Sequence, residues 1–119
     1  MGVRAYKDLI VWQKGMDFVE MVYRVTQSFP NEERYGLTNQ LRRAAVSIPS
    51  NIAEGQGRGV GKEFGYHVRV AQGSIQESET QLLLAGRLRF MTEEEQEGLL
   101  KCSDELSRLN RGLYKSITK

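Results

Sequence analysis

The sequence predicts an all-α protein, an antiparallel up-down-up-down four-helix bundle with a proline-kinked second helix. Apolar residues recur at helical spacing in four segments, and no stretch shows sustained strand-type alternation. Short connections join the four segments, as in antiparallel bundles. The chain has 119 residues, of which 39% are hydrophobic and 27% are charged. This length and composition suit one globular domain spanning residues 1–119.

The first helix is expected over residues 8–29, ending before Pro30. Its apolar residues form two rows that together cover an arc of about 160°, wider than the stripe of about 100° that one core usually needs. Part of this arc is therefore free to cover another surface. The two rows are Leu9, Trp12, Met16, Val19 and Tyr23, and Val11, Phe18, Val22, Val25 and Phe29.

The second helix is expected over residues 34–56, with Pro49 inside its apolar pattern. Proline removes one backbone donor and disfavours helix at the preceding residue, which predicts a kink or a short break. The stripe resumes in phase at Ile52, and this favours one kinked helix over two separate helices. The stripe consists of Leu37, Leu41, Ala44, Ala45, Ile48 and Ile52.

The third and fourth helices follow a glycine-rich connection at residues 55–61. The third is expected over residues 62–89. The fourth begins with a capping box in which Thr92 caps the helix and Glu95 reaches back. The third stripe is spaced 4-3-4-3-4-3 and consists of Phe64, Val68, Ala71, Ile75, Ser78, Leu82 and Ala85; the fourth consists of Leu99, Cys102, Leu106, Leu109, Leu113 and Ile117.

Few residues in the chain suit catalysis. His67 is the only histidine, and Cys102, the only cysteine, lies on a core stripe of a different helix. The glycine run has no G-K-[ST] ending and follows a helix, so it is not a phosphate loop. We expect no enzymatic activity, no catalytic residues, no metal and no cofactor. The N-terminus has no apolar signal core and no segment is long enough to span a membrane, which favours a soluble, cytoplasmic protein.

The polar face of the second helix carries Arg43, Ser47, Ser50 and Glu54, with Asn51 at its edge. One interpretation is an ordinary solvated face. The other is a polar network between helices or between subunits, because Ser-Ile-Pro-Ser-Asn has low helix propensity and is an unusual choice for a plain surface helix.

Basic residues form stripes on the last two helices. Lys62 and Arg69 are seven residues apart on the third helix, with Arg87 on the same side, and Lys101, Arg108 and Lys115 repeat by seven on the fourth, with Arg111 alongside. On a monomer such stripes commonly serve solvation. Repeated around a ring of subunits, they would become a strongly positive surface, although the formal net charge is only +2.

Several features predict self-association: the wide arc of the first helix, apolar residues away from the stripes, and glycines inside the third helix, which cost stability unless another backbone comes close. The candidate partner or subunit interface consists of Trp12, Val46, Ser47, Asn51, Glu54, Tyr66 and Gly73.

Four segments carry a family resemblance: YKDLIVWQK (6–14), YGLTNQLRRAAVSIPSNIAEG (35–55), KEF (62–64) and ETQLLL (79–84). The chain resembles the four-helix-bundle proteins of the 23S rRNA-intervening-sequence family, which includes the accessory variability determinants of diversity-generating retroelements. The resemblance implies a bacterial, non-catalytic ring, typically a homopentamer. In the retroelement branch it implies binding to a reverse transcriptase and its template RNA. The family motif maps onto Arg42, Arg43, Ser47, Pro49, Asn51, Glu54 and Arg58, whereas the loop Gly59-Val60-Gly61 departs from it.

We therefore expect a homo-oligomer that binds RNA or DNA through its basic surfaces with little sequence specificity, as an accessory protein to a reverse transcriptase. The alternative is a protein encoded in an rRNA insert that acts as a protein-interaction scaffold. The candidate phosphate contacts are Arg42, Arg43, Arg58, Lys62, Arg69 and Arg87.

Overall fold

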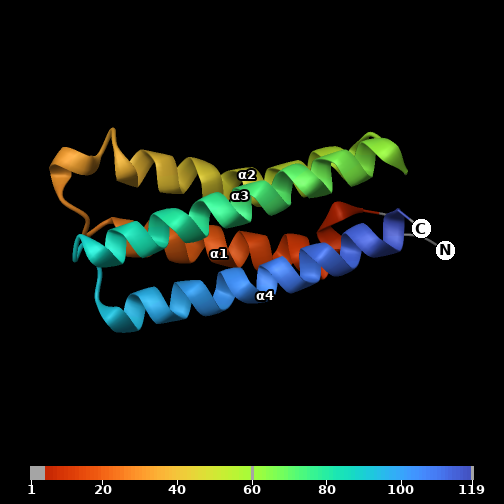
Figure 1. The fold of residues 1–119 in the computed structure, drawn as a ribbon. Helices are drawn as coiled ribbons and strands as arrows, with labels where there is room; N and C mark the ends of the chain where they lie inside the picture. The colour runs from red at the N-terminus through yellow and green to blue at the C-terminus, as the bar shows by residue number, and fades with distance from the viewer. Residues whose placement is uncertain (1–4, 60, 119) are drawn as a thin grey trace.

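The computed structural model describes residues 5–59 and 61–118, and every regular element in these ranges is helical. The long helices are α1 (Ile10–Thr26), α2 (Leu37–Gly57), α3 (Lys62–Arg87) and α4 (Glu93–Ile117). Two short 3-10 helices, η1 (Tyr6–Asp8) and η2 (Asn31–Glu33), precede α1 and α2. In Figure 1 the chain runs from right to left along α1 and α3, and back from left to right along α2 and α4. None of these helices is long and apolar enough to cross a bilayer.

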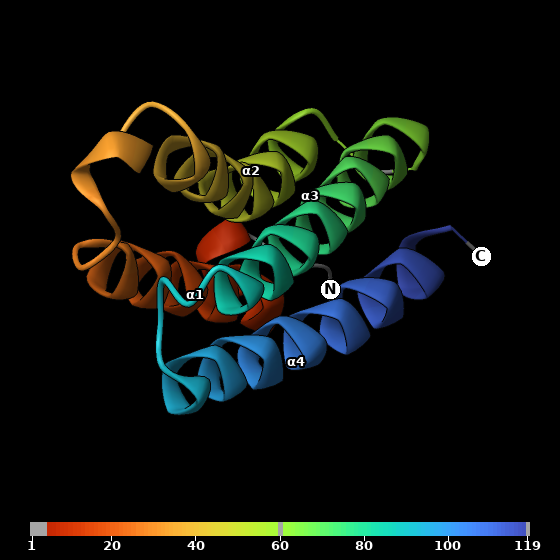
Figure 2. The same ribbon diagram turned by 60° about the vertical axis from the view of Figure 1, so that its left-hand side comes forward.

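The four helices pack as a square. Consecutive helices are in contact, α1 also contacts α4, and the diagonal pairs make no close backbone contact within the described residues. Figure 2 shows this arrangement from a direction in which α2 lies above α1 and α3 lies above α4. The predicted all-α bundle is confirmed.

The predicted stripes of α2 and α3 lie in the core, whereas in the stripe of α4 only Leu99 and Leu106 are buried and the other four residues are partly buried. Every stripe residue of α2 and α3 is buried, and Phe18, Leu41, Val68 and Leu106 are fully enclosed. The two rows of α1 behave differently. The row that includes Phe18 and Val22 faces the core, whereas Met16 in the other row is 41% exposed. The arc of α1 is thus wider than the core that it covers.

Two helices begin later than the sequence predicts. The first starts at Ile10 rather than at residue 8, because Leu9 has an extended backbone and η1 precedes it. The second starts at Leu37 rather than at residue 34, because Gly36 has a backbone conformation (φ −111°, ψ −116°) outside the helical region. The Glu33 carboxylate accepts a hydrogen bond from the Leu37 N–H at 3.0 Å and so caps α2.

Pro49 lies inside a single helix, as the in-phase stripe predicts. It is buried against α1, where Gly15 leaves room for the proline ring: a Cβ on Gly15 would lie 3.4 Å from the Pro49 Cβ and Cδ atoms. The bend at Pro49 stays a prediction. The glycine-rich loop is described only in part, because Val60 lies outside the described residues.

The connection between α3 and α4 contains one feature that the sequence predicts and one that it does not. Thr92 and Glu95 form the predicted capping box. Arg89, just before it, has φ 63°. The hydrogen bonds from the Phe90 N–H to the Ala85 carbonyl and from the Arg89 N–H to the Gly86 carbonyl define a Schellman motif. The left-handed position that glycine usually occupies is therefore held by arginine, which ends α3 two residues earlier than predicted.

Replacing Arg89 by glycine should raise the free energy of unfolding by about 1 kcal/mol, because the left-handed conformation is unfavourable for a residue with a Cβ. The matched control is Arg87→Gly at the last residue of α3, which should lower stability. Chemical denaturation monitored by circular dichroism measures both. A loss of stability in both variants would contradict a strained Arg89.

Candidate nucleic-acid interface

Arg42, the first candidate phosphate contact, is held by the packing of α2 against α1. Its Nε donates to the Thr26 hydroxyl at 2.8 Å, and its guanidinium lies 4.4 Å from the centre of the Tyr23 ring. Thr26 is buried and donates its own hydroxyl proton to the Val22 carbonyl at 2.7 Å. Arg42 therefore has a structural role that the sequence did not indicate, and a large part of its guanidinium is already engaged.

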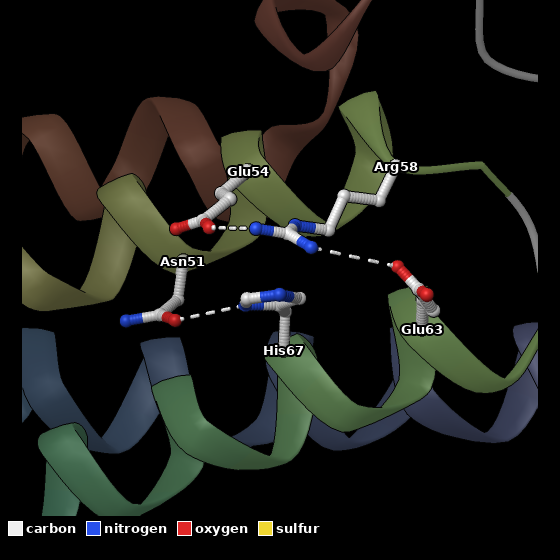
Figure 3. A network of polar contacts seen from close by, with 5 residues as sticks. All are labelled: Asn51, Glu54, Arg58, Glu63 and His67. Atoms are coloured by element: carbon white, nitrogen blue, oxygen red, sulfur yellow. Dashed lines mark hydrogen bonds and ion pairs between the residues drawn. The ribbon is translucent and has the colours of Figure 1, made fainter.

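Arg58 is engaged as well. Its guanidinium lies 3.0 Å from a carboxylate oxygen of Glu54 and 3.8 Å from one of Glu63, so that it links the end of α2 to the start of α3 (Figure 3). These pairs are about half exposed and contribute little to stability. They do offset the charge of Arg58, which leaves it a weak site for a phosphate.

Lys62 and Arg69 lie on the same surface as two further cations, which come from α4. Two adjoining cavities lie between α3 and α4, of about 640 Å³ and 280 Å³, and both are lined by Arg69 and Tyr114. Lys62 and Tyr66 line the larger cavity, and the smaller one is lined by two more cations, Arg111 and Lys115. We call the surface formed by Lys62, Tyr66, Arg69, Arg111, Tyr114 and Lys115 the basic face.

The basic face carries an uncompensated positive charge. No carboxylate lines either cavity, and none of its four cations forms an ion pair within the part of the chain that the structure describes. Charge is segregated along α4, because its first turn contains Glu93, Glu94 and Glu95 and its last turn contains Lys115. This order also suits the helix dipole.

The remaining candidates lie elsewhere. Arg43 is exposed and lines a shallow cavity beside Tyr23 and Arg42. Arg87 is exposed at the other end of α3, about 27 Å from Arg69 along the helix axis at 1.5 Å per residue. The structure thus groups two of the six candidate phosphate contacts, Lys62 and Arg69, and adds Arg111 and Lys115.

Ser47 and Asn51 belong to a network within the chain. The Ser47 and Ser74 hydroxyl oxygens are 2.8 Å apart, and the Asn51 amide nitrogen donates to the Ser47 carbonyl at 2.9 Å. The Asn51 amide oxygen therefore faces His67 Nδ1 at 3.1 Å (Figure 3), which assigns the proton of a neutral His67 to Nδ1. For Ser47 and Asn51 the structure therefore supports the second interpretation of this helix face, a polar network between helices.

The other interface candidates lie on separate surfaces. Trp12 and Val46 line a shallow, mainly apolar groove between α1 and α2, together with Met16 and Pro49. Tyr66 is 64% exposed on the basic face. Gly73 is exposed on α3, and a Cβ there would meet nothing within 4 Å in this chain. Nothing in one chain tests their assignment to a subunit interface, which stays a prediction.

The groups that suit catalysis are dispersed. Burial raises the pKa of the Cys102 thiol, and the carboxylates of Glu105 and Asp17 raise it further against the opposing effect of Lys14. The thiol is thus protonated at neutral pH and a weak nucleophile. Within the described ranges, no three His, Cys, Asp or Glu side chains are grouped so that they could hold a metal ion.

Sequence reasoning missed one buried polar group at the basic face. Asn110 is 1% exposed between the stripe positions Leu106 and Leu113. Its amide nitrogen donates to the Val68 carbonyl at 3.0 Å and so joins α4 to α3. The available signal was its position beside the apolar stripe of α4, where an asparagine is unusual.

Fold and surface together define a small antiparallel four-helix bundle with one basic, aromatic face. The family model described as 23S rRNA-intervening sequence protein matches residues 7–112, and the chain belongs to this family. A solved structure from Bacteroides thetaiotaomicron, a protein of unknown function from the S23 ribosomal protein family, has the same fold: the TM-score is 0.80 at 23% identity, over 89% of this chain and 99% of that chain. No curated protein is significantly similar.

Replacing Arg42 by alanine should lower the free energy of unfolding by about 1–2 kcal/mol, because it removes a hydrogen bond to a buried hydroxyl and a cation–π contact. Its exposed neighbour provides the control: Arg43→Ala should change stability by less than about 0.5 kcal/mol. Urea denaturation separates the two. If both variants are equally stable, the contacts of Arg42 do not stabilise the fold, and Arg42 is a free surface cation like Arg43.

Proposed function

We propose that this chain is a non-enzymatic, homo-oligomeric protein that binds nucleic acid through its basic face. The observation that carries the proposal is the convergence of Lys62, Arg69, Arg111 and Lys115 from two helices onto cavities that no carboxylate of the described residues lines. Unpaired cations attract the phosphates of a nucleic acid whatever its base sequence, and tyrosines beside them provide rings on which bases can stack.

Sequence specificity should be weak. The cations are exposed on the surfaces of α3 and α4, and such side chains follow a phosphate backbone rather than read base edges. Among the described residues, no helix projects from the narrow bundle to enter a major groove (Figure 1). A single strand or an irregular RNA is the favoured ligand, because its backbone can bend along the face.

Self-association is the second part of the proposal, and we assign it to the groove between α1 and α2. Met16 and Val46 are 41% and 38% exposed there, and Trp12 is half-buried against Tyr6. A ring of subunits, a pentamer by family resemblance, would repeat the basic face and strengthen the field that attracts nucleic acid. A reverse transcriptase as the protein partner rests on the family resemblance.

The alternative is a protein-interaction scaffold in the same family, in which the groove is the working surface. The internal engagement of Arg42 and Arg58 favours it, because these two cations are less available to phosphates. In this case charge substitutions on the basic face would leave RNA binding unchanged, and a charge placed in the groove would impair the capture of a protein.

Changing Lys62, Arg69, Arg111 and Lys115 together to glutamine should weaken RNA binding and flatten its salt dependence. Each lost phosphate contact on a single strand lowers the slope of log affinity against log salt by about 0.7, so the slope should fall by about 3. Filter binding or fluorescence anisotropy over a salt series measures it.

The control for this variant changes the same charge elsewhere, with glutamine at Arg24, Arg34, Arg87 and Lys101, all exposed. If both variants lose the same affinity, the net charge of the protein and not the basic face controls binding. If the unmodified protein binds RNA with no salt dependence, phosphate-driven binding is wrong.

Val46→Glu should convert the oligomer to smaller species, because it places a charge on the apolar groove. Leu83→Glu is the control, since Leu83 is 48% exposed on α3, outside the groove. Sedimentation velocity at micromolar concentration distinguishes them. A monomeric unmodified protein would exclude self-association, and an unaffected Val46→Glu variant would place the interface elsewhere.

A further inference from the structure

Asn110 has an amide oxygen without a partner. The amide nitrogen donates to the Val68 carbonyl at 3.0 Å and to Gln72 Oε1 at 3.2 Å. These two acceptors fix the orientation of the amide, because the opposite orientation would bring its oxygen against the two acceptor oxygens. The Oδ1 atom is then buried and accepts no hydrogen bond from any described residue. Buried acceptors are rarely left in this state, and one that is calls for an explanation.

The polar groups next to Asn110 do not satisfy this oxygen. The Gln72 amide is used at both ends, since its nitrogen donates to the Ser107 hydroxyl at 2.8 Å and its oxygen accepts from Asn110. Arg69, Arg111 and Lys115 lie nearby on the same two helices, and none of them donates to Asn110 in the structure. No described residue supplies the missing donor, which leaves this oxygen open to a donor from outside these residues, a water molecule or a ligand.

A cavity lies at this position. The smaller of the two cavities of the basic face, about 280 Å³, is lined by the buried residues Asn110 and Val68 and by Gln72, and by more exposed residues that include Tyr114 and three cations. Its lining is therefore neutral and partly apolar inside and positively charged outside. Oδ1 has no contact with solvent, so a ligand that reaches it must displace a side chain of the inner wall, and Gln72 is the polar side chain in that wall.

The chemistry of the lining restricts the ligand. A phosphodiester has no O–H or N–H group to donate to Oδ1, and a cationic amine is repelled by Arg69, Arg111 and Lys115. A neutral N–H donor attached to an anionic group satisfies both parts of the cavity. A nucleobase linked to its phosphodiester backbone is such a group, and its flat ring also suits packing against Tyr114.

We propose that the cavity at Asn110 holds one unstacked base of a single-stranded nucleic acid. An N–H group of the base donates to Asn110 Oδ1, Tyr114 packs against the ring, and Arg69, Arg111 and Lys115 hold the adjoining phosphates. This inference rests on the proposed function, because it names the ligand class that the basic face takes. A base in a duplex is paired and stacked and does not reach the cavity.

The test compares a short single strand of mixed sequence with an abasic strand of the same length. Both carry the same phosphates, so the ratio of their affinities isolates the contribution of the bases. We expect the complete strand to bind about tenfold more tightly, since the stacking of one base contributes on the order of tenfold in affinity. Fluorescence anisotropy at fixed salt measures the ratio.

Variants test whether the preference for the complete strand arises at the cavity. Tyr114→Ala and Asn110→Leu should reduce the ratio toward one with little change in binding of the abasic strand, whereas Tyr114→Phe keeps an aromatic ring and should keep most of the ratio. Tyr35→Ala is the matched control, because Tyr35 is 86% exposed and lies outside the basic face and both of its cavities. Tyr114 is only partly buried, so its variants test the cavity even if Asn110→Leu fails to fold.

The outcomes separate the inference from the proposed function. If both strands bind equally well to the unmodified protein, the base cavity is wrong and phosphate-driven binding stands. A preference for the complete strand that survives Tyr114→Ala would place base contacts outside this cavity and also overturn the inference. If neither strand binds at low salt, the proposed function itself fails, and the inference fails with it.

Discussion

The arrangement of this molecule depends on the seven core positions of α3, from Phe64 to Ala85. All seven are buried, and they hold α3 against both α2 and α4. Because core positions repeat every seven residues, outward positions repeat with the same period. Lys62 and Arg69 are seven apart, so the packing that closes the core also places both cations on one outer surface, beside the end of α4.

Features that depend on periodicity and local pattern could be predicted from the sequence. The stripes, the single helix through Pro49 and the capping box at Thr92 are of this kind, and each is present in the structure. Sequence was insufficient where the outcome depends on a partner far along the chain. Arg42 contacts Thr26 at a separation of 16 residues, and Asn110 contacts Val68 at a separation of 42. The left-handed backbone of Arg89 could not be predicted either, because glycine usually marks such a position and arginine does not.

Net charge is a poor guide to the electrostatics of this chain. The formal value of +2 is an average over an acidic start of α4, the internal pairs of Arg58 and the unpaired cations of the basic face. What matters to an approaching polyanion is the potential over one surface. The same separation of charge gives the bundle two electrically different ends.

The contact between Asn51 and His67 has a consequence for the tautomer of the imidazole. The Asn51 amide nitrogen donates to the Ser47 carbonyl, so the amide oxygen is the atom that faces the ring and a neutral His67 carries its proton on Nδ1. This leaves Nε2 of the neutral ring as an acceptor, one residue along the chain from Tyr66. The packing of α2 against α3 therefore decides which kind of hydrogen-bonding group His67 has left for other partners.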